Sequence, residues 1–431
     1  MTIKYVKFRL QNETELALLN RESSTYYITC LDYIRGSRLY GAFGNALIHQ
    51  SGIAEEIYSG KKTAREVAES LDPKTEFEEL FKKFFTKSDF VISFSDALLC
   101  PNNLDILNNG GTIPPLLTLN KCRMGSINKN NIKRHTQDVS RILLEKQISG
   151  NVLVKNSRLL CSKCGSPMKK SSSLLYYSPS KNKLLTDITA KISAKVGIAR
   201  HPILKSVKKE AKSANETPKG QMYTMEYLDR GQIFEFYSTY DSDFVSNKEI
   251  IDFIEMSCIG AKRNAGFGKV SIKMIKEYSE ESLADNLYNR YEDWCKQDYN
   301  GSYNNYSKYI PFYLHSDYIP STNKEFEEII LNKDWKISQL SAKTTNIGLY
   351  IAKDGGRPDQ HKTQGWRRGS YFYIKTEKNL DKEDFKSLIK ARTRRIGELS
   401  HRGFGEIRIL PQFIFKNERI DKSQMKNQII S

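Results

Sequence analysis

The sequence IGAKRNAGFGKVSI, residues 259–272, returns in nearly the same form as IGELSHRGFGEIRI, residues 396–409. Both segments read Ile-Gly, five further residues, Gly-Phe-Gly, one charged residue, and an alternating tail typical of a β-strand. Glycine is needed where a backbone turns sharply or approaches another backbone closely, and it also allows consecutive N–H groups to face a phosphate. The repeat therefore predicts the same helix-to-strand joint in two similar units.

The segment before the first copy has the signals of an amphipathic helix. Ser246 and Glu249 have capping-box spacing, and apolar residues follow at helical intervals through Cys258. We expect a helix from about 247 to 261, followed by a strand over 269–275. Upstream, the periodicity predicts a strand over 3–18, an extended segment ending at Cys30, a helix between Ser37 and Gly52, charged helical sequence over 63–87, a strand over 90–99, and a hairpin over 221–240 around Asp229-Arg230-Gly231.

The second half of the chain repeats this order. Strand-like segments over 309–319 and 346–352 precede a Gly-rich turn and a strand over 369–375, and Asp381 caps a helix that leads into the second copy. Strand, helix, paired strands, helix and strand form the βαββαβ order of a ferredoxin-like unit. The predicted fold class is α+β, with two ferredoxin-like domains over 1–275 and 307–431, an insertion over about 100–220 in the first, and a connection over 276–306.

The charge balance favours a polyanionic partner. The 431 residues include 68 Lys and Arg against 50 Asp and Glu, a formal net charge of +18. Such an excess attracts nucleic acid, although a generally basic proteome gives the same sign. No run approaches the roughly 18 apolar residues of a membrane helix. The N-terminal MTIKYVKFRL alternates as a strand does, unlike a secretory signal. We therefore expect a cytoplasmic protein with no membrane partner.

A Cys-x-x-Cys pair in the insertion predicts a structural zinc site. The two-residue gap between Cys161 and Cys164 lets both sulfurs face one tetrahedral ion. Cys122 and His135 are the expected further ligands, and Cys100 is an alternative to Cys122. A polar insertion with few apolar residues gains stability from bound metal. The alternative interpretation is that the pair are two ordinary loop cysteines.

The glycine phrases do not fit the common nucleotide-binding motifs. A dinucleotide fingerprint and a phosphate-binding P-loop both place their glycines between a strand and a following helix, whereas here a helix comes first and a strand follows. A tight turn around a packed Phe267 or Phe404 is the simplest explanation. Two copies with identical spacing, each beside basic residues, favour contact with an RNA backbone.

These features together resemble the RAMP superfamily of CRISPR-associated RNA-binding proteins. The glycine phrases match its loop between last helix and last strand, and IRGSRLYGAFGNAL (34–47) is similar to its early helix entry. The Cys- and His-containing insertion, the segment over 197–236 that resembles a long hairpin, and GGRPDQHKTQGWRRGSYFYI (355–374) narrow the resemblance to the RAMP subunit of type III-D effector complexes. This resemblance implies binding of CRISPR RNA near its 5′ tag, contacts with other RAMP subunits and with the large polymerase-like subunit, and indirect contact with target RNA.

The resemblance and the basic clusters together give a set of candidate RNA contacts. For any single residue, a solvated surface charge is the alternative. The candidates lie at the helix entry, in the two glycine loops, in the expected long hairpin, and beside Trp366; they are Arg35, Gly36, Ser37, Arg38, Lys262, Arg263, Gly266, Gly268, Arg394, Arg395, Arg402, Gly403, Gly405, Arg200, Lys205, Lys208, Lys209, Arg367 and Arg368.

Catalysis is the less favoured interpretation. Metal-independent RNA cleavage needs a base and an acid, and His49 on the first helix or His401 in the second loop could serve. The resemblance also raises metal-dependent cleavage at Asp32. Each has an ordinary explanation, such as compensation of a helix dipole by His49. We expect a non-catalytic subunit, with a CRISPR RNA-processing endoribonuclease and an unrelated zinc-containing RNA-binding protein as the alternatives.

Overall fold

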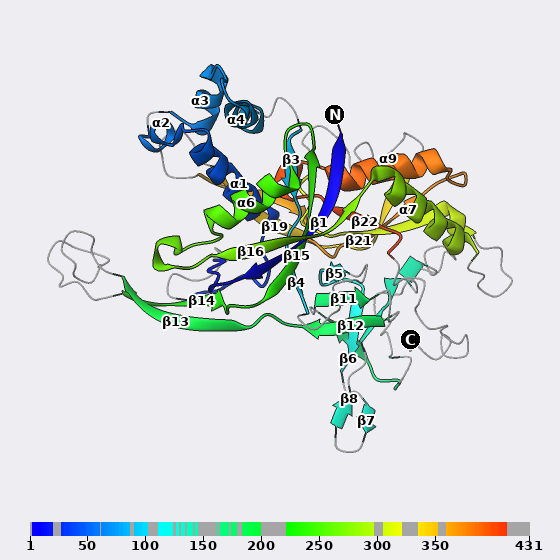
Figure 1. Ribbon diagram of the computed structural model, residues 1–431. Helices are drawn as coiled ribbons and strands as arrows, with labels where there is room; N and C mark the ends of the chain where they lie inside the picture. Colours follow the sequence, from blue (N-terminus) through cyan, green and yellow to red (C-terminus); the bar gives the residue numbers. More distant parts are fainter. Residues whose placement is uncertain are drawn as a thin grey trace.

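The computed structural model describes most of the 431-residue chain. The described residues are 2–19, 27–60, 62–86, 90–101, 111–123, 126–128, 131–133, 136–140, 143–144, 161, 164–171, 174–178, 183–199, 221–296, 305–320, 335–351 and 359–411. Within them, antiparallel sheets pack against helices (Figure 1). The expected α+β class is confirmed.

The N-terminal half is built on an antiparallel sheet with the strand order β16-β1-β15-β3, and β4 pairs with β15 beside β3. The strands are β1 (Ile3–Asn12), β3 (Ile92–Phe94), β4 (Leu98–Cys100), β15 (Ile233–Asp241) and β16 (Val270–Tyr278). Helices α1 (Gly36–Gln50) and α6 (Asn247–Ser257) bury Leu39, Phe43 and Ile254 in the core that the sheet shares with them. The expected capping box of Ser246 and Glu249 begins α6. The helices α2 (Ala54–Tyr58), α3 (Ala64–Ser70) and α4 (Glu76–Thr86) extend from α1 (Figure 1).

The C-terminal half has a second sheet with the order β18-β21-β17-β22. Its elements are β17 (Tyr309–Leu314), β18 (Lys336–Ser341), β21 (Tyr371–Lys375), α9 (Lys382–Arg394) and β22 (Ile407–Ile409). We number the four main strands of each sheet in chain order, which leaves out β4. Their order across the sheet is then four, one, three, two in both halves. Asp381 caps α9 as expected. Helix α7 (Glu280–Cys295) lies within the stretch that we expected to be a connection, and it packs beside α9 in the second core.

The structure corrects two strand predictions. The segment over 346–352 was expected in the main sheet. It forms β19 (Thr344–Ile351), which pairs instead with β20 (Asp359–Trp366), a strand that the sequence did not predict. The position expected for it in the main sheet is occupied by β18. The prediction of a hairpin around Asp229-Arg230-Gly231 is also wrong. Strand β15 pairs with β1 in one sheet, whereas β14 (Gln221–Leu228) pairs with β13 (Ile192–Ala199) and β2 (Tyr27–Ile28) in another. The long hairpin is therefore β13–β14.

The insertion forms small sheets below the two main ones (Figure 1). Its strands are β5 (Gly111–Ile113), β6 (Leu119–Cys122), β7 (Ser126–Asn128), β8 (Asn131–Lys133), β9 (Thr136–Asp138), β10 (Met168–Lys170), β11 (Leu174–Ser178) and β12 (Lys183–Ile188). The orders are β10-β6-β9, β12-β11-β5 and β7-β8. Leu119 and Leu175 from these strands lie in the core of the C-terminal half, so the insertion is packed against the body of the molecule.

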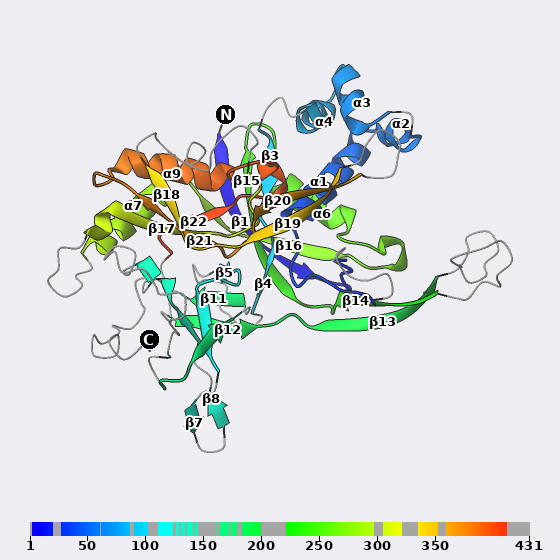
Figure 2. The same ribbon diagram turned by 180° about the vertical axis from the view of Figure 1, so that it is seen from behind.

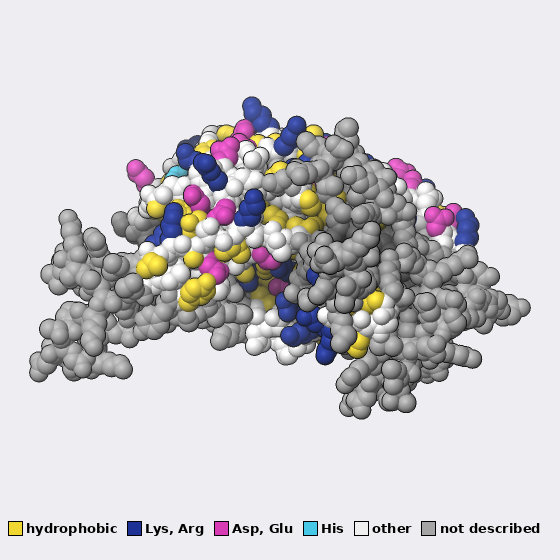
Figure 3. Space-filling model, turned by 90° about the horizontal axis from the view of Figure 1, so that it is seen from below, with side chains coloured by type: hydrophobic (Ala, Val, Ile, Leu, Met, Phe, Trp, Pro, Cys, Tyr) yellow, Lys and Arg dark blue, Asp and Glu magenta, His cyan; other side chains and the backbone are white. Residues whose placement is uncertain are grey.

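The two halves share a continuous interior. Tyr5 of β1 is buried in the same cluster as Phe312 and Leu388 of the C-terminal half. Seen from behind, β19 and β20 lie across the region near α1 (Figure 2). On the face seen from below, Lys and Arg side chains gather near the middle, beside hydrophobic side chains (Figure 3). Among the described helices, none has the length and apolar character of a membrane span.

Candidate nucleic-acid interface

The two glycine phrases have the same backbone conformation. We call residues 258–268 the first glycine loop and residues 395–405 the second. Each begins at the end of a helix, contains a short 3-10 turn, and enters the last strand of its sheet. Each has positive φ at the same five positions, which are Cys258, Gly260, Lys262, Gly266 and Gly268 in the first loop and Arg395, Gly397, Leu399, Gly403 and Gly405 in the second. The expected repeated joint is present.

Equivalent hydrogen bonds hold both loops. The N–H of Ile259 donates to the carbonyl of Gly268 at 2.8 Å, and the N–H of Ile396 donates to Gly405 at 3.0 Å. The N–H groups of Gly266, Gly268, Gly403 and Gly405 all donate to backbone carbonyls within the chain. These four glycines thus supply the positive φ that the turn requires, and the expectation that they present N–H groups to a phosphate is not met.

The first glycine loop is open to solvent on one side. Lys262, Arg263 and Gly266 are exposed. A Cβ placed on Gly266 would meet nothing within 4 Å. Phe267 points the other way and packs edge-to-face against Tyr227 of β14, with ring centroids 5.7 Å apart. One aromatic anchor therefore fixes the loop to the β13–β14 hairpin and leaves its basic side chains outside.

The hairpin adds a cation and a ring to this exposed loop. Lys195 of β13 lies over the Tyr227 ring at 4.9 Å, and the ammonium of Lys262 donates to the hydroxyl of Tyr223 at 3.3 Å. We call Lys195, Tyr223, Lys262 and Arg263 the basic–aromatic surface. Cations interleaved with a partly exposed ring can hold phosphates and stack a base, which is how single-stranded nucleic acids are bound without reading sequence. No ion pair with a carboxylate occurs at Lys195, Lys262 or Arg263 within the described residues.

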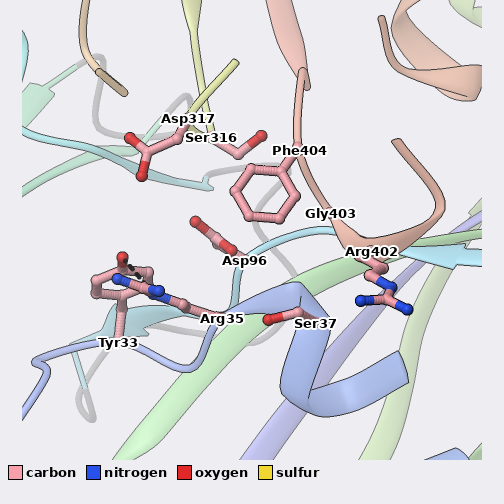
Figure 4. Close-up of a pocket in the computed structure, with 9 residues that line it drawn as sticks. All are labelled: Tyr33, Arg35, Ser37, Asp96, Ser316, Asp317, Arg402, Gly403 and Phe404. Carbon is pink, nitrogen blue, oxygen red and sulfur yellow. Dashed lines mark hydrogen bonds between the residues drawn. The ribbon is translucent and has the colours of Figure 1, made fainter. Parts of the chain in front are cut away.

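The second glycine loop instead closes against the start of α1 (Figure 4). The Cα of Gly36 and a Cβ placed on Gly403 would be 2.9 Å apart. The N–H of Gly36 donates to Asp96 at 2.9 Å, so that carboxylate caps α1. Residues from both halves line the remaining pocket, which are Tyr33, Arg35, Ser37, Asp96, Ser316, Asp317, Arg402, Gly403 and Phe404. Its volume of about 10 Å³ has room for about one water molecule.

Charges in this closed junction largely compensate one another. The Arg368 guanidinium lies 3.4 Å from the centre of the Tyr33 ring and 3.7 Å from a carboxylate oxygen of Asp32. Its backbone N–H donates to Asp317 at 2.8 Å. Burial raises the pKa of Asp96 to about 6, although Arg368 opposes the shift. The junction therefore joins the halves of the molecule, and Arg35, Ser37, Arg402 and Gly403 are brought together there.

The other expected RNA contacts are scattered. Arg395 is buried, where it donates to the Ser93 hydroxyl and to the Tyr237 carbonyl, so the structure assigns its side chain to the interior and contradicts the expected contact. Arg38 donates to the Leu19 carbonyl, whereas Arg367 and Arg394 are exposed. Arg200, Lys205, Lys208 and Lys209 lie outside the described residues.

The two candidate catalytic histidines lie near different parts of α1. His49 is exposed near its C-terminus, while His401 packs against Tyr40, with ring centroids 5.1 Å apart. Nine residues of helix separate Tyr40 from His49, or about 13 Å of axis. An acid and a base acting on one phosphodiester must lie within hydrogen-bond reach of it, and this pair does not converge. Asp32 pairs with Arg368, as described above.

Three cysteines converge in the insertion. The sulfurs of Cys122, Cys161 and Cys164 all lie within 4.8 Å of one another. Strand pairing of Met168 with Cys122 brings β10 alongside β6, and the N–H of Gly165, the residue after Cys164, donates to the Cys161 carbonyl at 2.8 Å. Three thiolates at this spacing fit three corners of a tetrahedral zinc site. Cys100 lies in β4, paired with Ile233, and is outside this cluster; His135 lies outside the described residues.

Comparison with protein families gives a clear result. The model of the RAMP superfamily matches residues 29–271, more than half of the chain. The chain belongs to the RAMP superfamily. No curated protein matches it. Among solved structures, the Csm3-Csm4 subcomplex of the type III-A CRISPR-Cas interference complex is 15% identical with a TM-score of 0.34, covering 87% of this chain and 94% of that one. The type III-B Cmr-beta complex bound to cognate target RNA and AMPPnP is 13% identical with a TM-score of 0.35, covering 85% and 86%.

Three residues that form the two sites of this RAMP protein were not predicted from its sequence. Asp96 caps α1 from another strand, and no local spacing links it to Gly36. Lys195 and Tyr223 face the first glycine loop only because β13 and β14 pair. The alternation of apolar and polar residues in AKISAKVGIA, residues 190–199, is a signal that could have revealed β13.

Proposed function

We propose that this RAMP protein is a non-catalytic RNA-binding subunit of a type III CRISPR effector complex, of the III-D kind, and that it holds the guide RNA near its 5′ tag. The observation that carries the proposal is the exposed basic–aromatic surface, where Lys262 and Arg263 of the first glycine loop meet Lys195 and Tyr223 of the hairpin. The net charge of +18 and the RAMP membership support the same class of ligand.

We infer further that each main sheet with its helices is a ferredoxin-like unit. The order four, one, three, two of both antiparallel sheets supports this, together with the equivalent glycine loops. The proposed units span 1–275 and 307–431, with the insertion in the first and α7 in the connecting stretch. Neighbouring RAMP subunits, the large polymerase-like subunit and, indirectly, target RNA are the proposed partners in the cytoplasm.

The insertion is proposed to hold a structural zinc ion. Cys122, Cys161 and Cys164 would supply three thiolates, and His135 is the proposed fourth ligand. Such an ion would tie β6 to the segment that carries Cys161 and Cys164 and would add to the stability of the insertion.

The RNA-binding proposal is tested by removing charge from the first glycine loop. The double variant Lys262→Gln/Arg263→Gln should bind single-stranded guide RNA about tenfold more weakly, and the slope of log affinity against log salt should become shallower by about 1.4, because two phosphate contacts are lost. Fluorescence anisotropy at several salt concentrations measures both quantities.

Lys248→Gln is the matched control. Lys248 is exposed at the opposite end of α6 from the loop, so the variant removes a positive charge without touching the surface. The double variant removes two charges and the control removes one, so equal weakening per removed charge would show a non-specific charge effect and would refute the proposed surface. Incubation of labelled repeat RNA with the protein in EDTA tests the endoribonuclease alternative, and specific cleavage lost in His49→Ala or His401→Ala would favour it.

A further inference from the structure

A second, larger cavity lies away from the basic–aromatic surface. Its volume is about 260 Å³, and it opens between the N-terminal sheet, helices α7 and α9, strand β22 and the insertion strand β5. The rim carries exposed residues, including Lys276 and Asn286, and the floor is formed by buried side chains such as Tyr313 and His315. The cavity is therefore accessible from solvent and has a closed inner end.

Cations dominate the walls. Lys276, Arg290, Arg392 and Arg408 line the cavity, and its described lining includes no carboxylate. Arg408 is paired with the buried Glu406 at 2.5 Å behind the wall. Arg290 donates to the backbone carbonyls of Leu410 and Asn286, and within the described residues no carboxylate pairs with Arg290 or Arg392. Two of the three guanidinium groups, those of Arg290 and Arg392, thus have no carboxylate partner within the described residues.

Holding these charges together has a cost in the absence of an anion. Burial, with repulsion from Arg392 and Arg408, lowers the pKa of Arg290 to about 10. Burial also lowers the pKa of His315 to about 3, so its imidazole is neutral at physiological pH and adds no charge. An arrangement of like charges that is unfavourable alone becomes favourable when a phosphate is bound between guanidinium groups.

Tyrosine rings hold the guanidinium groups in place. Tyr5 and Tyr237 are stacked with centroids 5.1 Å apart, Arg408 lies 4.3 Å from the Tyr237 ring, and Arg392 lies 5.4 Å from the Tyr5 ring. Tyr278 stands at the cavity wall next to Lys276. Of these rings, Tyr237 and Tyr278 line the cavity, and Tyr278 offers a partly exposed aromatic surface for a planar base next to the phosphate site.

We propose that this cavity binds a single nucleotide, with its phosphate between Arg290, Arg392 and Arg408 and its base against the tyrosine wall. The volume is close to the lower end of small-ligand sites, about 300 Å³, and suits one nucleotide better than a continuous strand. The nucleotide is either a free mononucleotide or one unit of an RNA chain that enters the cavity. The inference is independent of the proposed guide-RNA surface, because the two sites share no residue.

The test is binding of uridine monophosphate to the full-length protein after nucleic acid has been removed, with uridine and inorganic phosphate as comparison probes. Isothermal titration should give at least tenfold tighter binding of the monophosphate than of uridine. Arg392→Gln should weaken monophosphate binding at least tenfold. Lys390→Gln, at an exposed position of the same helix that does not line the cavity, should leave it unchanged.

Two controls address the folding of the variant protein and the source of the bound nucleotide. Arg392→Gln removes a repelling charge, so its melting temperature should not fall; if it does, Lys276→Gln at the exposed rim replaces it. If the cavity takes a unit of RNA, single-stranded RNA will compete with the monophosphate; if it takes a free mononucleotide, both will bind together. Monophosphate binding that is undetectable, or that is indifferent to Arg392 and Lys276, overturns the proposal, whatever the result for Lys262 and Arg263.

Discussion

The charged residue after Gly-Phe-Gly is Lys269 in the first loop and Glu406 in the second, and their environments are opposite. Lys269 is exposed, whereas Glu406 is fully buried and pairs with Arg408, with Arg395 at 3.9 Å. Burial disfavours the charged form of Glu406, but Arg408 and the other cations outweigh it and lower its pKa. A buried ion pair of this kind is retained where both partners are held in place, and here it fixes the second loop in the interior.

Asp96 should make the stability of the protein depend on pH. The pKa of its carboxyl is about 6 in the folded protein against an ordinary value of 3.8, because the side chain is buried. A raised pKa contributes stability below about pH 4, and this contribution is lost as the pH rises through 6. Asp96→Asn keeps an acceptor for the Gly36 N–H and cannot ionise.

The stability of Asp96→Asn relative to the wild type should therefore increase by on the order of 2–3 kcal/mol between pH 4 and pH 7. Urea unfolding at both pH values measures this difference. Asp252→Asn, at an exposed position of α6, is the control for a general change of charge. A relative stability of Asp96→Asn that is the same at both pH values would contradict the assignment.

At the scale of elements, the two glycine loops share a conformation and differ in what surrounds them. Gly266 and Gly403 occupy the same position, with φ of 85° and 94°. Nothing lies within 4 Å of a Cβ on Gly266, whereas a Cβ on Gly403 would lie 2.5 Å from the Phe94 carbonyl oxygen and 2.9 Å from the Gly36 Cα. The first loop is a surface element and the second is part of a packed joint.

Alanine at these two glycines should separate conformational strain from packing. Gly266→Ala should destabilise the protein by about 1–2 kcal/mol, the cost of a side chain at positive φ. Gly403→Ala adds overpacking of the joint, about 1–3 kcal/mol more. Denaturant unfolding compares the two variants directly, since each serves as the control for the other. Equal losses would mean that the joint can relax, and that the contact between η3 (Ser400–Arg402) and α1 is not tightly packed.

At the scale of the whole molecule, the insertion depends on a small cluster of side chains. Its cysteine cluster joins segments that are about forty residues apart, Cys122 on β6 and the Cys161–Cys164 turn. If zinc closes this loop, the protein purified in its presence should contain about one zinc per chain after dialysis. Cys122→Ser should lower that content and the melting temperature, because one ligand is lost.

Cys100→Ser is the control for the zinc prediction. Cys100 is a buried cysteine outside the cluster, so its replacement should leave the zinc content unchanged even if stability falls. Elemental analysis measures the zinc content of the wild type, Cys122→Ser and Cys100→Ser. Wild-type protein without zinc, or full zinc content in Cys122→Ser, would exclude the proposed site.

Local sequence was sufficient for much of the fold. The capping boxes before α6 and α9 and the periodicity of α1 are short-range signals, and they placed these helices correctly. The misassigned hairpin over 221–240 has a different origin. Strand β15 had two available partners, and the choice of β1 rather than β14 depends on packing between segments more than two hundred residues apart. A turn signal carries no information about that competition.

The sequence alone predicted the repeated joint, because three of the five positive-φ positions in each loop are glycines at identical spacing, and glycine meets that local requirement wherever it occurs. Only the tertiary structure decided which loop is accessible. The pairing of β13 with β14 set Lys195 and Tyr223 beside the open first loop, while the approach of α1 enclosed the second. Accessibility and charge compensation arise from contacts between distant segments, and spacing along a chain does not encode them.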